Sequence, residues 1–172
     1  EPSAWARKVA QEKFSLQVLG GTLEEASFPA SSFDVVTFID TLEHLRDPKG
    51  ALVEARRILK KEGVLYLTTP NIKSFISRLL GDVWWGLRQE HIVYFSKRSL
   101  SSLLKTVGFE CLSQRSLQHT FTVGGAVRRI KGVNPFFHQV AQPFVRFFRL
   151  EESYFKVNFF DQIELVARKG RG

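Results

Sequence analysis

The residues of this 172-residue chain best suited to chemistry gather in one stretch, FDVVTFIDTLEHLRDP at residues 33–48. Asp40 ends an apolar run there, and Glu43 and His44 follow it. A histidine has an unperturbed pKa of ~6.5, so it can take a proton from an acceptor hydroxyl near neutral pH. His44 can therefore serve as a general base, as a metal ligand or as a structural residue at a helix start.

The apolar pattern around these residues predicts the elements that position them. Residues 33–39 are almost continuously apolar and β-branched, which is typical of a strand buried on both faces of a parallel sheet. Asp47 and Pro48 then predict a helix start, with Asp47 capping the free amides and Pro48 in the first turn. We expect this helix to end at Gly63 and a strand to follow at residues 64–69. The core-facing positions of the helix should be Leu52, Ala55, Ile58 and Leu59.

The alternation of strand and helix continues along the chain. We expect a helix at 3–13, a strand at 14–19, a serine-capped helix at 99–107, a strand at 109–116 and a final strand at 161–168. This order is typical of an α/β protein with a doubly wound parallel sheet. Ligands bind such sheets beyond the carboxyl ends of the strands, which points to residues 1, 21–24, 40–44 and 70–71.

Residues 118–160 are aromatic and basic, and they predict one or two amphipathic helices broken at Pro135 and Pro143. The stretch from Phe136 to Phe148 also carries Arg146 and is followed by Arg149. We favour packing of its aromatic rings against the sheet. A lid, a dimer face and a membrane-surface helix are the alternatives.

Composition limits the classes of protein to consider. With 44% hydrophobic and 24% charged residues, the chain can build one core and is not a disordered polypeptide. The single cysteine, Cys111, excludes a disulfide framework and a cysteine zinc cluster. No apolar run approaches the ~18 residues of a membrane span, and no signal-peptide pattern begins the chain, so we expect a cytoplasmic protein.

The formal net charge is +8, and the excess of Lys and Arg lies in residues 73–115 and 128–171. A basic chain can bind nucleic acid or an anionic membrane surface. The charges are scattered and no RNA-binding motif is visible. We therefore interpret them as a solvated surface and predict no nucleic-acid partner.

The layout of residues 33–48 resembles that of class I S-adenosylmethionine-dependent methyltransferases of the small-molecule type. In these enzymes the fourth strand ends in an acidic turn, and the fifth strand follows the next helix. Other segments agree in order and spacing between Glu1 and Cys111. They are EPS at residues 1–3, GTLEEASFP at 21–29, KKEGVLYLTTPN at 60–71 and EHIVYFS at 90–96.

The resemblance implies a Rossmann-like, doubly wound and mostly parallel sheet with an antiparallel last strand. It implies a single methyltransferase domain at residues 1–172, with 118–160 as a small helical insertion or lid. The family's Gly-x-Gly-x-Gly loop would lie before the position that Glu1 matches. We therefore expect an N-terminally truncated domain, the C-terminal part of a longer enzyme.

The same resemblance assigns roles to individual residues, each of which can also be purely structural. Glu1 would bind the ribose hydroxyls of S-adenosylmethionine, and Leu23 and Glu24 would flank its adenine. Ile39, Asp40 and Thr41 would line the methionine side of the cofactor, with Asp40 and His44 as the catalytic pair. The acceptor pocket would be formed by Trp84, Trp85, His91 and Tyr94.

Asp40-x-x-Glu43-His44 also resembles the metal signature of some ubiquinone-pathway and small-RNA methyltransferases. Adding His91 would give an oxygen and nitrogen shell for Mg²⁺ or Mn²⁺. We favour a site without metal. The expected reaction is methyl transfer to a small-molecule acceptor, preferably an oxygen. A non-catalytic partner-binding module and an RNA 2′-O-methyltransferase remain as alternatives, and a homodimer is a further expectation.

Overall fold

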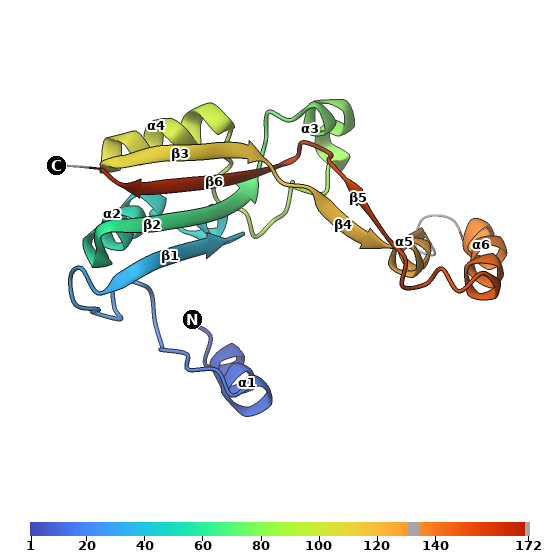
Figure 1. The fold of residues 1–172 in the computed structure, drawn as a ribbon, viewed down its shortest axis with the longest axis horizontal. Coiled ribbons are helices and arrows are strands. Elements are labelled where there is room, and N and C mark those ends of the chain that lie inside the picture. Colours follow the sequence, from blue (N-terminus) through green and yellow to red (C-terminus); the bar gives the residue numbers. More distant parts are fainter. Residues whose placement is uncertain (131–134, 171–172) are drawn as a thin grey trace.

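The computed structural model describes residues 1–130 and 135–170, and its centre is a four-stranded mixed sheet in the order β1-β2-β6-β3 (Figure 1). Strands β1 and β2 are parallel, and β6 runs antiparallel to both of its neighbours, β2 and β3. The predicted mixed sheet with an antiparallel last strand is thus confirmed. The bounds are Phe33–Ile39 (β1), Leu59–Pro70 (β2), Phe109–Ser116 (β3) and Gln162–Lys169 (β6).

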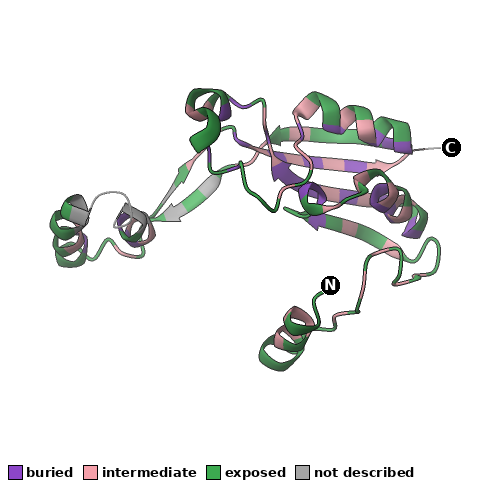
Figure 2. Ribbon diagram, turned by 180° about the vertical axis from the view of Figure 1, so that it is seen from behind, coloured by how far each residue is buried: buried purple, intermediate pink, exposed green. Residues whose placement is uncertain are grey.

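Helices α2 (Pro48–Ile58) and α4 (Lys97–Val107) lie on one face of this sheet and close the core (Figure 2). Asp47 accepts a hydrogen bond from the Gly50 amide, and Pro48 lies in the first turn of α2, as predicted. The core of the protein therefore forms between one sheet face and two amphipathic helices. The four positions predicted to face it from α2 and its end, Leu52, Ala55, Ile58 and Leu59, are all buried.

Strand β1 is buried on one face only, contrary to the expectation of burial on both. Phe38 points into the core, whereas Val35 is 53% exposed and Ile39 is 60% exposed. The reason is the layering, because α2 and α4 cover the same side and no described helix covers the other.

Two element boundaries also differ from the prediction. Helix α2 ends at Ile58 rather than at Gly63, because Leu59 already has extended backbone angles and begins β2. The pairing of β1 with β2 shifts register at this point, so residues 60–63 form an irregular start to the strand. Helix α4 begins at Lys97, earlier than expected, because Ser96 and Ser99 cap it reciprocally.

The N-terminal helix α1 (Ala4–Phe14) is confirmed, but the strand predicted at residues 14–19 is wrong. Ser15 turns left-handed after the helix, and the Ser15 and Leu16 amides bond back to carbonyls of α1. Among the described residues no strand lies beside 14–19 to supply ladder hydrogen bonds, so its alternating pattern leads only to a loop.

An arm formed by residues 119–157 projects from the carboxyl edge of the sheet (Figure 1). Its strands β4 (His119–Thr122) and β5 (Tyr154–Val157) pair antiparallel and carry helices α5 (Val123–Ile130) and α6 (Pro135–Phe147) at the far end. The segment that joins the helices, 131–134, lies outside the described residues. No described helix of the chain is long and apolar enough to cross a membrane.

The arm departs from the prediction in two ways. Pro143 lies inside α6 and does not break it, because Pro143 and Gln139 are both exposed and water can bond the carbonyl that the proline leaves free. The described aromatic side chains of α6, which are Phe136, Phe144 and Phe147, do not pack on the sheet, since the arm carries them away from it.

Candidate functional site

A cavity of about 630 Å³ opens at the carboxyl edge of the sheet, where β1 and β2 end and β6 begins. This is the edge at which the sequence analysis placed ligands. The cavity is bordered by the short 3₁₀ helix η1 (Leu42–His44) and by the segment 84–91, which follows α3 (Phe75–Leu80) and η2 (Gly81–Val83). Its lining residues are Asp40, Glu43, His44, Pro70, Trp84, Trp85, Gly86, Arg88, Glu90, His91, Asp161 and Gln162.

Asp40 is fixed where β1 turns away from the sheet. Its backbone is left-handed, with φ of 46°, a region that aspartate tolerates better than most residues. The Asp40 amide donates to the Thr68 carbonyl at 3.1 Å, and Thr68 Oγ1 donates to Asp40 Oδ1 at 2.9 Å. Gln162 Nε2 donates to the same oxygen. The carboxylate is thus held at the cavity wall by two neighbouring strands.

Glu43 is buried, with 1% of its surface exposed. Thr69 Oγ1 donates to Glu43 Oε2 at 3.0 Å, while Oε1 has no hydrogen-bond partner among the described residues. Burial is the main reason that the pKa of this carboxyl is raised above its ordinary value of 4.5. A buried carboxylate oxygen without a partner is costly unless a ligand or cation satisfies it.

His44 and His91 meet across the cavity, with ring centroids 4.7 Å apart and planes at 73°. His44 Nδ1 lies 2.9 Å from the Glu90 carbonyl, and His91 Nδ1 lies 2.9 Å from the Gly86 carbonyl. A carbonyl only accepts hydrogen bonds, so each Nδ1 carries the proton and each Nε2 keeps its lone pair. Both rings can therefore accept a proton or bind a cation through Nε2.

Three of the four metal candidates named from the sequence come together. Glu43, His44 and His91 each offer one ligand atom, and these atoms lie within 4.8 Å of one another. Asp40 does not join this group, because Thr68 and Gln162 hold its carboxylate at the end of β1. The backbone bonds to both Nδ1 atoms are the kind of support that metal-binding histidines use. This donor set fits a divalent cation.

The aromatic residues predicted for the acceptor pocket divide into two groups. Trp84, Trp85 and His91 line the cavity, and Trp85 Nε1 donates to Asp161 Oδ2 at 2.7 Å. Tyr94 lies behind them: its ring packs on His91, and its hydroxyl bonds to the backbone of Arg88. Tyr94 therefore supports the wall without lining it.

A second cavity, of about 340 Å³, lies beside the N-terminal residues and brings Glu1 and Leu23 together. Glu1 Oε1 also accepts a hydrogen bond from the Ser3 amide at 2.9 Å. The remaining walls are mostly apolar and backbone surfaces from residues 17–28. The other predicted cofactor residues, Glu24, Ile39 and Thr41, are exposed and line neither of these cavities.

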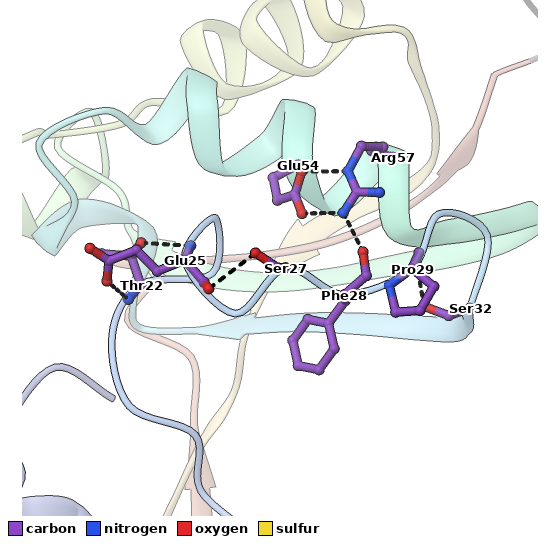
Figure 3. A network of polar contacts seen from close by, with 8 residues as sticks. All are labelled: Thr22, Glu25, Ser27, Phe28, Pro29, Ser32, Glu54 and Arg57. Atoms are coloured by element: carbon purple, nitrogen blue, oxygen red, sulfur yellow. Dashed lines mark hydrogen bonds and ion pairs between the residues drawn. The ribbon is translucent and has the colours of Figure 1, made fainter.

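The loop that carries Leu23 is attached to α2 by a network of polar contacts (Figure 3). Arg57 donates to both carboxylate oxygens of Glu54 and to the carbonyl of Phe28. Glu25 accepts from the Thr22 amide within the same loop. These contacts fix the wall of the second cavity relative to the core.

Sequence reasoning missed the contribution of β6. Asp161 and Gln162 line the main cavity because β6 is antiparallel and so begins at the edge where β1 and β2 end. They are more than a hundred positions from Asp40 along the chain. The available signal was the predicted antiparallel last strand, which places the residues before it at the ligand edge.

Comparison with known proteins agrees with this geometry. A family model described as a methyltransferase domain matches residues 1–114. The chain is 30% identical over 106 residues to 2-methyl-6-phytyl-1,4-hydroquinone methyltransferase 2 of Oryza sativa subsp. japonica, covering 58% of this chain and 30% of that protein. It is 33% identical over 89 residues to the ubiquinone biosynthesis O-methyltransferase of Actinobacillus pleuropneumoniae serotype 5b, covering 47% and 38%. The chain thus spans well under half the length of these curated relatives.

Among solved structures, a Thermotoga maritima protein described as a SAM-dependent methyltransferase and possible histamine N-methyltransferase superposes with a TM-score of 0.65. The match covers 98% of this chain and 71% of that one at 24% identity. This similarity extends to the arm as well as the sheet, and at this identity it shows the fold alone.

Proposed function

The chain belongs to the methyltransferase-domain family, and on that premise we propose that the protein transfers a methyl group from S-adenosylmethionine to an oxygen of a small-molecule acceptor. The observation that carries the proposal is the cavity at the carboxyl edge of the sheet, which Asp40, His44 and His91 line. A curated relative named as an O-methyltransferase supports an oxygen acceptor, and one named as a methyltransferase of a hydroquinone supports a small-molecule acceptor.

The residues present fit S-adenosylmethionine in two places. Glu1 offers a carboxylate for ribose hydroxyls, and Leu23 and Phe28 offer apolar surface for the adenine ring in the smaller cavity. Asp40 offers a fixed negative charge at the larger cavity, where it would attract the positively charged sulfonium. When bound, the cofactor supplies the methyl group.

His44 is the proposed general base. Its Nδ1 proton is engaged by the Glu90 carbonyl, so the Nε2 lone pair is available for the acceptor proton. An acceptor hydroxyl bound beside His44 would give its proton to Nε2, and its oxygen would receive the methyl group that bound S-adenosylmethionine would supply.

A divalent cation is the second form of this proposal, supported by the unpartnered Glu43 Oε1 beside His44 and His91. A cation there would bind the acceptor oxygen and lower the pKa of its hydroxyl. In that form His44 is a ligand and cannot be the base. The effect of a chelator on turnover distinguishes the form without metal from the form with a cation.

Methyl transfer at the main cavity does not require the arm to act as a lid or to form a homodimer contact, so both roles remain predictions. A cytoplasmic location is likewise an expectation from composition. The comparisons name small-molecule enzymes, which favours a small acceptor over RNA or a non-catalytic role.

The test is S-adenosylhomocysteine formation by the purified protein with a panel of catechols, hydroquinones and other phenols. We expect turnover that falls strongly in His44→Gln and Asp40→Asn and is unchanged in Lys105→Gln, an exposed substitution on α4. Activity that persists in chelator supports His44 as base, whereas activity that needs added Mg²⁺ or Mn²⁺ supports the cation. No turnover with any hydroxyl acceptor, together with no binding of S-adenosylhomocysteine, would contradict the proposal.

A further inference from the structure

The outer face of α6 is a stripe of apolar side chains that nothing in the described structure covers. Phe136 is 74% exposed and Phe147 is 81% exposed, and Val140, Phe144 and Phe148 are also exposed. Their spacing of three and four residues places them on one side of the helix. The opposite side, with Val145 buried, packs toward α5. Helix α6 therefore exposes its most aromatic face and packs its opposite face against α5.

The aromatic rings at the end of this stripe form a cluster of their own. Phe144 and Phe148 have ring centroids 4.5 Å apart, and Phe147 and Phe148 have centroids 5.1 Å apart. Exposed apolar patches of this kind on a soluble surface usually mark an interaction site. An aromatic cluster at the tip of a projecting arm is well placed for contact with a large, flat partner.

The charge of the arm has one prevailing sign. In the sequence of residues 119–160, two acidic residues, Glu151 and Glu152, stand against six basic ones: Arg128, Arg129, Lys131, Arg146, Arg149 and Lys156. Arg146 pairs with Glu151 at 3.4 Å, which leaves the balance of the arm positive. An excess of basic residues on an arm that also exposes aromatic side chains complements a surface that is apolar inside and anionic at its rim.

The arm leaves the body at the edge where the main cavity opens. Strand β3 ends at Ser116 shortly before β4, and β5 is followed by Asp161 and Gln162, which line the cavity. A surface that received the arm would therefore lie beyond the carboxyl edge of the sheet, from which the arm projects (Figure 1).

We propose that the arm docks on the surface of an anionic phospholipid bilayer, with the aromatic stripe of α6 at the headgroup and acyl boundary. A second copy of the chain fits these observations less well. Apposing two identical arms would bring two positive surfaces together, and like charges across an interface oppose association. The occupant is a lipid surface because it satisfies both the apolar stripe and the excess of positive charge on the arm.

The test is co-sedimentation of the full chain with vesicles of phosphatidylglycerol and phosphatidylcholine, compared with vesicles of phosphatidylcholine alone. We expect binding to the anionic vesicles that weakens as salt is added. The double substitution Phe136→Ser and Phe147→Ser should lower the partition coefficient by at least about tenfold, since it removes two interfacial aromatic anchors. Arg149→Gln should lower it by about fivefold, the equivalent of ~1 kcal/mol for one basic residue near an anionic surface.

The matched controls lie outside the arm. Phe14→Ser removes an exposed phenylalanine from the end of α1, and Lys105→Gln removes an exposed charge from α4. Both should bind vesicles like the unmodified protein, and circular dichroism should show that all variants are folded. Methyl transfer is not a readout, so failure of the proposed enzyme function leaves this test intact.

Either of two vesicle results would overturn the inference: the unmodified protein does not bind anionic vesicles, or the double variant binds them as well as the unmodified protein does. A light-scattering mass of a dimer that becomes a monomer in the double variant while vesicles are not bound would assign the stripe to a second copy.

Discussion

The rings of His44 and His91 lie 4.7 Å apart, and each is oriented through Nδ1 by a backbone carbonyl of the same short segment. The carbonyls belong to Glu90 and Gly86, so the path of residues 86–91 sets both rings at once. The amides of Ile92 and Val93 then bond to the carbonyl of Glu43, which fastens this segment to η1. The two histidines are thus parts of one unit, although they come from different regions of the chain.

Substitution of His44 should remove proton transfer without emptying the cofactor site. We expect His44→Gln to lower turnover by about 10²-fold or more, the usual contribution of a general base. Affinity for S-adenosylhomocysteine, measured by calorimetry, should stay within a small factor of the original. Equal losses of binding and turnover would instead indicate a structural role.

The Glu43, His44 and His91 cluster predicts stabilisation by a divalent cation if the second form of the mechanism holds. At a concentration about 100 times its dissociation constant, Mn²⁺ should raise the free energy of unfolding by about 2.7 kcal/mol. His91→Gln should abolish this gain. Asp40→Asn should retain it, because Asp40 lies outside the cluster. Thermal unfolding with and without chelator measures the effect, and identical curves would exclude the cation.

Two substitutions of Asp40 can distinguish its conformational role, which is to adopt a left-handed backbone, from the chemical role of its carboxylate. Asp40→Asn should fold with nearly unchanged stability, since asparagine also tolerates this region. Asp40→Val should lose about 1–2 kcal/mol, because a β-branched residue is strained there. Both variants should lose methyl transfer if the carboxylate acts on the cofactor. Chemical denaturation and turnover, measured side by side, distinguish the two effects.

The ion pair between Glu54 and Arg57 predicts a dependence of stability on acid. The hydrogen bond from Arg57 holds the pKa of the Glu54 carboxyl below its ordinary value of 4.5. A lowered folded-state pKa adds stability that is present above 4.5 and is lost as the pH falls through the folded-state value.

Glu54→Gln should therefore lower the melting temperature at neutral pH, and this difference should shrink in acid. Melting curves measured from neutral pH down to about pH 3 check it. Lys60→Gln, which breaks the more exposed pair with Asp34, is the control and should show a smaller effect. A difference that grows on acidification would contradict the assignment.

Much of the fold followed from local pattern. Strand β1, helix α2, helix α4 and strand β3 were predicted because apolar periodicity and capping residues act within a few positions of one another. The prediction of a strand at 14–19 was wrong because a strand needs a neighbouring strand for its backbone hydrogen bonds, and a local pattern does not reveal whether one is present. The prediction that Pro143 breaks the helix was wrong, because the effect of a proline depends on whether water can bond the carbonyl it leaves free, here that of Gln139.

The residues of the candidate site also fall into those that local sequence pattern predicted and those whose positions depend on the tertiary structure. Asp40, Glu43 and His44 were visible in the sequence because they follow a buried strand within a few residues of it. His91, Trp84 and Trp85 could be suggested by the family resemblance, but their positions around the cavity depend on the path of residues 81–93. The contact of Gln162 with Asp40 was not predicted, because it joins distant parts of the chain through the pairing of β2 with β6.

By itself, the sequence determined most of the strands and helices, the acidic turn after β1 and the residue types available for methyl transfer, since these depend on short-range patterns. The antiparallel last strand was expected only from the family resemblance. Only the tertiary structure decided which side chains meet. It placed Glu43, His44 and His91 together, excluded Asp40 from that cluster and turned the aromatic face of α6 outward. The physical reason is that such contacts are set by strand order and by which faces remain to be packed, and both are properties of the whole chain.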